Sequence, residues 1–423
     1  MDKFIITGGT PLRGEIPISG SKNGALPLMA AALLGDGPTT LSNIPRLNDI
    51  YTFSNVIRGT GIDVQFDELN NTLTIDPRSF NLAEAPYDLV RKMRASFYML
   101  GALLGRVGHA KVSLPGGCAW GPRPVNLHIE GLKALGAEIE MDGGYVVAKA
   151  KDGRLQGGHF LMEPSSVGAT INLVLAASTA RGKSILHNCA IEPDVVVLCK
   201  ALASMGAQIE GIGTHTLTIH GVERLHAADL VNAPDRIETG TFMIAAAMHP
   251  DSQVTLTGTD PSDLGYFTEV FMKTGAEVLI DGSTIHVKAP NRILPVSIKT
   301  QVYPGFPTDL QAQWATMLTL ADGTASVTDT IYTDRFSYVP ELVRLGADLH
   351  VEGNLVMVKG PNTLKGASVM STDLRASVSL VMAAMVAQGT SEVLRVYHLD
   401  RGYETLELKL NKVGARITRS KDQ

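Results

Sequence analysis

The sequence predicts an α/β protein of two similar lobes, in each of which three buried helices are surrounded by strands. Three observations lead to this prediction. The chain has 423 residues, a length that suits two domains of about 200 residues each. A short glycine-containing pattern recurs along the chain, and each recurrence is accompanied by one helix that is apolar on nearly all faces.

A glycine between a helix-like stretch and an alternating stretch marks each repeat. The six glycines are Gly61, Gly136, Gly206, Gly275, Gly346 and Gly414, so successive spacings are 75, 70, 69, 71 and 68 residues. Stretches such as "VPELVRLGA" precede the glycine, and stretches such as "AEVLIDGSTIHVKA" follow it. The second kind alternates polar and apolar residues around a turn, which is typical of a β-hairpin. Spacing this regular indicates an internal repeat, with three units in each lobe.

Each repeat also contains a second helix that begins with small or charged residues and then becomes apolar. These six stretches span residues 21–34, 93–105, 165–178, 236–248, 306–321 and 372–387. A helix that is apolar all round is buried, so we expect these helices inside and the strands outside. Helix N-termini carry unpaired N–H groups and a positive dipole end, which favour anions. If the helices of a lobe run parallel, their N-termini form an anion site between the lobes.

Four basic residues stand at the starts of these helices, where the dipole disfavours cations. They are Lys22, Arg94, Arg236 and Arg375. A multiply charged anionic ligand would explain them, although a solvated lysine remains the alternative for Lys22. Ser, Thr and Asp at the same places are also explained as N-caps. For Asp373 both interpretations stay open, namely a cap paired with Arg375 and a binding role.

Two further residues are candidates for chemistry. Cys118 lies in "SLPGGCAWGPRPVNLH", where Pro and Gly exclude regular structure and favour a surface loop. This favours a functional thiol over a buried packing cysteine. Asp309 follows Phe306 and Pro307 and precedes an apolar helix. A carboxylate desolvated in this way can act as a base. Arg335 and Arg401, taken alone, would be surface arginines.

Composition excludes several classes of protein. A net charge of −5 argues against a general binder of nucleic acid or of membrane surfaces. The apolar runs are shorter than the roughly 20 residues of a membrane span, and the first residues lack a signal-like apolar core, so we expect a cytoplasmic protein. The chain has three cysteines, an odd number, and their spacing is not that of metal ligands; they are Cys118, Cys189 and Cys199. This predicts reduced thiols and no metal site.

Nine motifs resemble, in order, those of the bacterial UDP-N-acetylglucosamine 1-carboxyvinyltransferases. They are "ISGSKNGALP", "MRAS", "LPGGCAWGPRPVNLH", "SVGAT", "DRIETGTF", "FPTDLQAQ", "DRF", "TDLRAS" and "HLDRGYE". The resemblance implies an inside-out α/β barrel in each lobe. It also implies that residues 22–233 form one lobe, that residues 1–21 and 234–423 form the other, and that the active site lies in the cleft between them.

The resemblance further implies an enzyme. Its reaction would move the enolpyruvyl group of phosphoenolpyruvate to the 3'-hydroxyl of UDP-N-acetylglucosamine and release phosphate, by addition and elimination. This is the first committed step of peptidoglycan synthesis. No metal or organic cofactor is implied. The expected partners are the two substrates, without nucleic acid, membrane or an obligate protein partner.

Residue roles are implied by the same motifs. Lys22, Arg123 and Arg401 would bind phosphoenolpyruvate, and Asp309 would take the proton from the attacking hydroxyl. Cys118 would be the general acid toward C3 of the enol and the target of the epoxide antibiotic fosfomycin. With the basic residues at the helix starts included, the expected substrate-binding set is Asn23, Arg94, Arg123, Pro124, Val125, Asn126, Leu127, Ser166, Val167, Gly168, Arg236, Ile331, Arg335, Asp373 and Arg375.

Three alternatives remain at this point. The sister enzyme that acts on shikimate 3-phosphate shares the fold and the chemistry but lacks the cysteine loop. A non-catalytic sensor of sugar nucleotides could keep the fold, since fold does not fix function. An RNA-end-processing enzyme built on similar repeats is disfavoured by the acidic balance of charge.

Overall fold

The computed structural model describes residues 2–91, 93–114 and 125–421. The chain forms two compact units. We call Gly20–Ala233 the N-unit, and Met1–Ser19 together with Pro234–Gln423 the C-unit. The division falls at Gly20, two residues before the boundary at residue 22 that the resemblance implied. The N-terminal segment therefore belongs to the C-unit.

The described residues form six four-stranded sheets that share one order: a parallel pair, then two antiparallel pairings. The N-unit sheets are β14 (Asp229–Val231)–β3 (Thr39–Ser42)–β5 (Thr72–Asp76)–β4 (Asp63–Asp67), β6 (Glu84–Ala85)–β7 (His109–Ser113)–β9 (Tyr145–Ala150)–β8 (Ala137–Asp142), and β10 (His159–Leu161)–β11 (Lys183–His187)–β13 (Thr216–His220)–β12 (Gln208–Glu210). The C-unit sheets are β2 (Arg13–Pro17)–β15 (Gln253–Thr257)–β17 (Thr284–Lys288)–β16 (Glu277–Asp281), β18 (Ile298–Lys299)–β19 (Thr324–Thr328)–β21 (Leu355–Lys359)–β20 (Asp348–Glu352), and β22 (Ser368–Met370)–β23 (Thr390–Leu394)–β1 (Asp2–Thr7)–β24 (Ile417–Lys421).

Three strands pair far from their neighbours in sequence. Strand β2 precedes the first N-unit helix along the chain but pairs with β15 of the C-unit. Strand β14 follows the three N-unit repeats and closes the first of them by pairing with β3. Strand β1 lies between β23 and β24, so the last alternating stretch pairs with the N-terminus and not with a hairpin neighbour. The expectation of a hairpin after every repeat glycine is therefore wrong for the sixth repeat.

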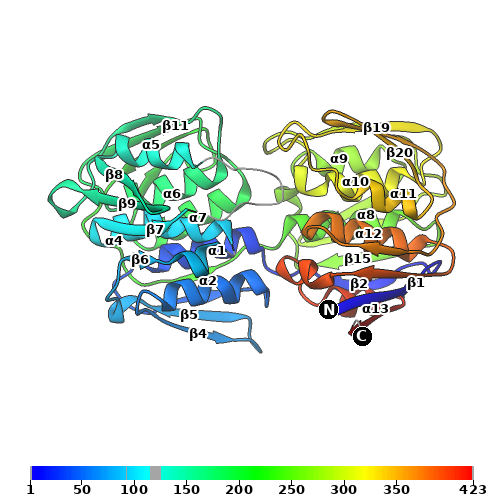
Figure 1. Cartoon of the computed structure of the whole chain (residues 1–423), viewed down its shortest axis with the longest axis horizontal. Helices are drawn as coiled ribbons and strands as arrows, with labels where there is room; N and C mark the ends of the chain where they lie inside the picture. The colour runs from blue at the N-terminus through cyan, green and yellow to red at the C-terminus, as the bar shows by residue number, and fades with distance from the viewer. Residues whose placement is uncertain (1, 92, 115–124, 422–423) are drawn as a thin grey trace. The chain divides into compact units, whose positions relative to one another are not determined.

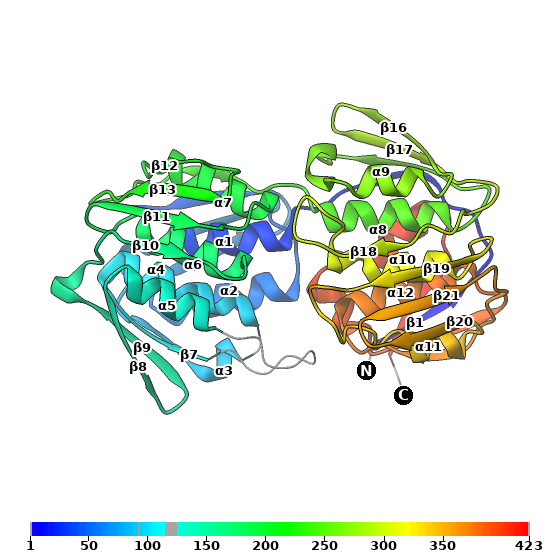
Figure 2. The same cartoon turned by 90° about the horizontal axis from the view of Figure 1, so that it is seen from above.

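The six apolar helices are buried, as the sequence predicts. They are α1 (Lys22–Ala32), α4 (Met99–Val107) and α6 (Val167–Ala177) in the N-unit, and α8 (Arg236–Ala247), α10 (Gln311–Leu318) and α12 (Leu374–Val386) in the C-unit. Within each unit they pack on one another, with the sheets around them (Figures 1 and 2). Two of them begin as 3₁₀ turns, η2 (Arg94–Tyr98) and η5 (Thr308–Leu310), a common way to start an α-helix.

The remaining helices are less buried, and the longer one in each of the first five repeats precedes a hairpin. They are α2 (Asn48–Arg58), α5 (Asn126–Ala134), α7 (Pro193–Ser204), α9 (Phe267–Met272), α11 (Val339–Arg344) and α13 (Leu406–Lys412), with the short α3 (Tyr87–Val90), η1 (Pro77–Ser79), η3 (Lys151–Gly153), η4 (Pro261–Leu264) and η6 (Val396–Arg401). The repeat glycines that follow the six longer ones all have positive φ angles, from 83° at Gly136 to 111° at Gly414. Other residues are strained in that conformation, which explains why glycine marks the repeat.

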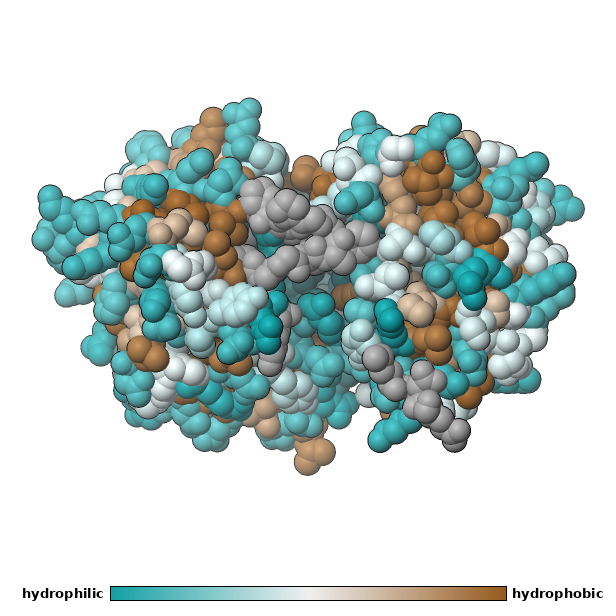
Figure 3. Space-filling model, viewed as in Figure 1, coloured by the Kyte–Doolittle hydropathy of each residue, from teal (hydrophilic) through white to brown (hydrophobic). Residues whose placement is uncertain are grey.

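Each unit has its own hydrophobic core, built mainly from the inner helices and the inward faces of the strands. Figure 3 shows hydrophilic residues over much of one face of both units, with hydrophobic residues in smaller patches. Among the described residues, none of the helices combines the length and the hydropathy that a membrane span requires.

Candidate active site

A cluster of charged side chains in the C-unit surrounds Asp309. This residue lies in η5, immediately before α10. Its Oδ1 is 2.8 Å from Nη1 of Arg335, and its Oδ2 is 3.5 Å from Nη2 of Arg375. Arg375 stands in the first turn of α12, so residues at the starts of two inner helices meet. The side chains of both arginines are nearly buried, with 9% and 6% of their area exposed, whereas that of Asp309 keeps 29%.

The arginines determine the charge of Asp309. Burial alone would raise the pKa of this carboxyl group, but the charges of Arg375, Arg335 and Arg236 outweigh burial and hold its pKa well below the usual range. Burial alone would lower the pKa of Arg375, but Asp309, together with Tyr403 and Asp235, outweighs burial and raises it. Asp309 and Arg375 are therefore both ionised at neutral pH.

Two more polar residues, Arg236 and Asp373, lie at the N-termini of α8 and α12. Arg236 is the first residue of α8, and its guanidinium lies 5.5 Å from the ring centre of Tyr303. The Asp373 carboxylate caps α12 by accepting from the backbone N–H groups of Arg375, at 2.8 Å, and Ala376, at 3.1 Å. The guanidinium of Arg375 pairs with Asp309 instead. Of the interpretation of Asp373 as a cap paired with Arg375, the cap is confirmed and the ion pair is wrong, while the binding role stays a prediction.

A buried carboxylate that sequence reasoning missed supports Asp309. Asp329 is fully buried and accepts from Oγ1 of Thr308 at 2.6 Å and from the backbone N–H of Ile331 at 2.9 Å. Thr308 Oγ1 in turn accepts from Nη1 of Arg335 at 3.2 Å. Asp329 thereby fixes both the residue before Asp309 and the expected nucleotide contact Ile331, which is 38% exposed. The only sequence signal was an Asp two residues before Ile331, a pattern typical of an Asx turn.

In the N-unit, Lys22 and Asn23 begin α1. Nζ of Lys22 is 3.1 Å from Oδ2 of Asp49 on α2, and the two side chains are 14% and 6% exposed. Lys22 is thus not a solvated lysine, and its partner was not predicted. Asn23 is exposed, whereas Ser21 before it caps the helix by accepting from the N–H of Gly24 at 3.1 Å.

The start of α6 contains the next expected contacts. Ser166 caps the helix, and Val167 and Gly168, both half-buried, form its first turn. A Cβ atom at Gly168 would lie 3.2 Å from Cε1 of His128, closer than most real contacts. Gly168 therefore allows the His128 ring to pack beneath this turn. Arg94, half-buried at the start of η2, acts electrostatically on the same histidine.

Other expected residues are more widely placed. Val125, Asn126 and Leu127 lead into and begin α5, with Asn126 exposed. Arg401 is half-buried at the end of η6. Three expected residues, Cys118, Arg123 and Pro124, lie outside the described residues. Cys189 and Cys199 are buried, and burial raises the pKa of each thiol to about 12.

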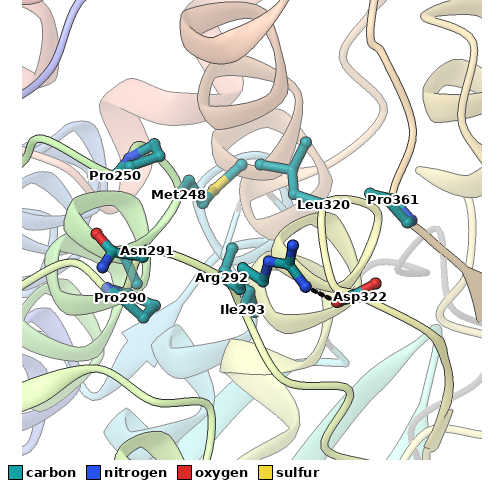
Figure 4. A pocket seen from close by; sticks show the side chains of 10 residues that line it. Met248, Pro250, Pro290, Asn291, Arg292, Ile293, Leu320, Asp322 and Pro361 are labelled. Atoms are coloured by element: carbon teal, nitrogen blue, oxygen red, sulfur yellow. Dashed lines mark hydrogen bonds and ion pairs between the residues drawn. The ribbon is translucent and has the colours of Figure 1, made fainter.

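A pocket of about 430 Å³ lies elsewhere in the C-unit (Figure 4). It is lined by residues at the C-terminal end of α8, such as Met248, by Leu320 beyond α10, and by Ile293. Arg292 and Asp322 at its edge pair with each other at 3.2 Å. It adjoins the end of α8 that is opposite to Arg236, so it is separate from the Asp309 cluster.

The Asp309 cluster is chemically suited to bind an anion beside one ionised carboxylate. Basic groups and helix N-termini occur together in both units, and the cation-rich cluster of the C-unit contains Asp309. Among the described residues, no group of three or more His, Cys, Asp or Glu could hold a metal ion.

Comparisons with known proteins agree with this chemistry. Residues 6–410 match the family described as EPSP synthase (3-phosphoshikimate 1-carboxyvinyltransferase). A UDP-N-acetylglucosamine 1-carboxyvinyltransferase of Chloroherpeton thalassium is 51% identical over 99% of this chain and 97% of its own. One of Chlorobium phaeovibrioides is 50% identical over 100% of this chain and 99% of its own.

Solved structures extend the likeness to the fold. The enolpyruvyl transferase NikO of Streptomyces tendae superposes with a TM-score of 0.90 at 27% identity, covering 99% of both chains. EPSP synthase of Acinetobacter baumannii gives 0.77 at 18% identity over 100% of both chains, which shows the fold alone. The expected enolpyruvyl transferase fold and the family resemblance are confirmed. The chain belongs to the EPSP synthase family and, within it, to the UDP-N-acetylglucosamine 1-carboxyvinyltransferases.

Proposed function

We propose that the protein transfers the enolpyruvyl group of phosphoenolpyruvate to the 3'-hydroxyl of UDP-N-acetylglucosamine and releases phosphate, as the first committed step of peptidoglycan synthesis in the cytoplasm. The observation that carries the proposal is the Asp309 cluster: an ionised carboxylate, 29% exposed, held by two nearly buried arginines. The names of relatives at about half identity over the whole chain support the choice of substrates.

The reaction balances as an addition followed by an elimination. The 3'-oxygen bonds to C2 of phosphoenolpyruvate while its proton passes to Asp309, and Cys118 supplies a proton to C3. The adduct then loses a proton from C3 as the bond between C2 and the phosphate oxygen breaks, which restores the enol and leaves phosphate. No electrons are exchanged with a cofactor. Lys22, Arg123 and Arg401 would hold the phosphate and carboxylate of phosphoenolpyruvate.

The ion pairs between Asp309 and its arginines affect how well Asp309 can act as the base in this mechanism. A carboxylate whose pKa is held low is always ionised but is a weak base. Phosphoenolpyruvate brings a carboxylate and a phosphate that compete for guanidinium groups, for which arginine is well suited. When this substrate binds, its anionic groups would take over part of the contact that the arginines make with Asp309. The pKa of Asp309 would then rise toward the range in which the carboxylate accepts a proton.

Phosphate release tests the function directly. We expect release with phosphoenolpyruvate plus UDP-N-acetylglucosamine and none with phosphoenolpyruvate plus shikimate 3-phosphate. The opposite preference would identify the sister activity. Release with neither, together with protection against heat by the sugar nucleotide, would indicate a sensor that has lost its chemistry.

The Asp309→Ala variant tests the assignment of the base. It should bind both substrates, because Lys22 and the nucleotide contacts remain, and lose turnover by about a hundredfold or more, the scale of a lost general base. Turnover is measured as phosphate release, and binding as the thermal shift that each substrate produces. Near-normal turnover would move the base to another residue.

A further inference from the structure

A buried hydroxyl lies behind the Asp309 cluster. Tyr403 follows η6 and is 2% exposed. Its Oη is 3.1 Å from Nη1 of Arg375, 2.9 Å from Oγ1 of Thr241 and 3.4 Å from Nε2 of Gln313. Thr241, Gln313 and Arg375 lie on α8, α10 and α12, so one hydroxyl joins all three inner helices of the C-unit.

The direction of these hydrogen bonds follows from counting protons. Thr241 has one hydroxyl proton and donates it to the backbone carbonyl of Ile237 at 2.8 Å. The bond between Thr241 and Tyr403 must then be donated by Tyr403. The Tyr403 oxygen therefore presents lone pairs, and not its proton, to Arg375. Burial raises the pKa of Tyr403, so the hydroxyl keeps this proton near neutral pH.

Gln313 completes the same arrangement. Its Nε2 donates to the backbone carbonyl of Asp309 at 3.0 Å, and a carbonyl can only accept, which fixes the orientation of the amide. The same nitrogen is 3.2 Å from Oγ1 of Thr241. Gln313 and Thr241 are 0% and 1% exposed, so water does not compete for these bonds. The backbone of Asp309 and the hydroxyl of Tyr403 are thus tied to one framework.

Arg375 is held at two points. Nη1 donates to Tyr403, while Nη2 reaches Oδ2 of Asp309. We propose that Tyr403 is a positioning residue of the reaction: its hydroxyl fixes the Arg375 guanidinium against Asp309 and so sets the orientation and charge of the carboxylate that receives the substrate proton. The inference rests on the proposed function, since it assigns the role through Asp309.

The Tyr403→Phe variant tests this role because it keeps the ring and removes one oxygen. Nη1 of Arg375 then loses a buried acceptor, and the guanidinium is free to leave Asp309. We expect kcat to fall about tenfold, the scale of one hydrogen bond to a charged group. KM for the sugar nucleotide should stay within about twofold. The acid limb of the pH profile of kcat should move to higher pH, because a less tightly paired Asp309 has a higher pKa.

Two variants serve as controls. Thr241→Ser keeps the hydroxyl that accepts from Tyr403 and should preserve the wild-type kcat and acid limb. Thr274→Val removes one oxygen from another buried side chain of the C-unit, whose Oγ1 donates to the backbone carbonyl of Phe271 at 2.6 Å. It should lower thermal stability without moving the acid limb. A loss of stability that Tyr403→Phe and Thr274→Val share is thereby distinguished from the pH shift, which only Tyr403→Phe should show.

A second readout does not depend on turnover. Carbon-13 NMR of aspartate-labelled protein, titrated downward from pH 7 and with the Asp309 signal assigned by its loss in Asp309→Asn, should show Asp309 protonating at a higher pH in Tyr403→Phe than in the wild type. An unchanged signal with an unchanged kcat and acid limb overturns the inference. The two proposals can fail separately. If the wild type releases no phosphate but the NMR signal still shifts in Tyr403→Phe, the proposed function is wrong and the positioning of Asp309 by Tyr403 is retained.

Discussion

The stability of the N-unit should depend on pH through His128. This side chain is 4% exposed, its Nδ1 is 2.8 Å from Nδ2 of Asn172, and the Phe97 ring packs against it edge-on with centroids 5.1 Å apart. The amide nitrogen must donate, so the Nδ1 atom accepts and the ring is neutral. Burial, with a smaller contribution from the charge of Arg94, lowers the pKa of His128 to about 3.

The sign and size of the effect follow from linkage. An unfolded histidine has a pKa of about 6.5, so below that pH the unfolded chain binds a proton that the folded chain does not. Stability is fully present above about pH 6.5 and is lost as the pH falls toward 3. At pH 5, about 1.5 units below the unfolded pKa, the loss is about 2 kcal/mol.

The perturbation is His128→Gln, which keeps an acceptor for Asn172 but cannot titrate. Urea unfolding at pH 8 and pH 5, followed by circular dichroism, gives the change in stability for each protein. A chain of two units need not unfold in one step, so the transitions are fitted separately. The variant will be less stable at pH 8, but its loss between pH 8 and pH 5 should be about 2 kcal/mol smaller than that of the wild type. His350→Gln, at a histidine whose side chain is 72% exposed, is the control. Equal pH dependence in the wild type and His128→Gln would refute the reasoning.

Two further predictions concern other parts of the chain. Glu238→Ala removes the ion-pair partner of Lys409, 2.8 Å away, in a pair whose side chains are 2% and 11% exposed. Because a buried cation loses its ion-pair partner, the free energy of unfolding of the C-unit, measured by urea titration, should fall by about 3–5 kcal/mol. The control is Lys273→Ala, in a pair with both side chains 58% exposed, which should cost less than about 1 kcal/mol in the same titration. Cys118→Asp should keep turnover and resist inactivation by fosfomycin in a timed activity assay, and inactivation as fast as in the wild type would show that the loop was assigned wrongly.

The repeat could be predicted from the sequence because its signals are local. A glycine with positive φ must follow each longer outer helix, and a helix that is apolar on every face must be buried wherever it lies. The pairing of β2 with β15 and of β14 with β3 has no local signal. Strands β2 and β14 each precede an inner helix in the chain. Which sheet each of them joins is decided only when the two separate barrels close.

The site was predictable to the extent that its residues begin inner helices. Lys22, Asp309 and Arg375 were found because charged residues interrupt otherwise apolar stretches. Their supports were missed, because Asp49 and Tyr403 belong to other elements and contact the site only through the tertiary fold. A polar residue on a less buried helix or in a loop looks like any solvated residue until its partner is known.

An anionic ligand is not needed to explain every cation at a helix N-terminus. The structure supplies protein carboxylates for two of these cations: Asp49 for Lys22 and Asp309 for Arg375. A cation placed against the dipole is therefore explained in part by the protein's own anion. What points to a ligand is the imbalance at Asp309, where three guanidinium groups act on one carboxylate that is still 29% exposed. An anion that enters such a cluster meets cations already desolvated and oriented, so it gains attraction without the cost of assembling them.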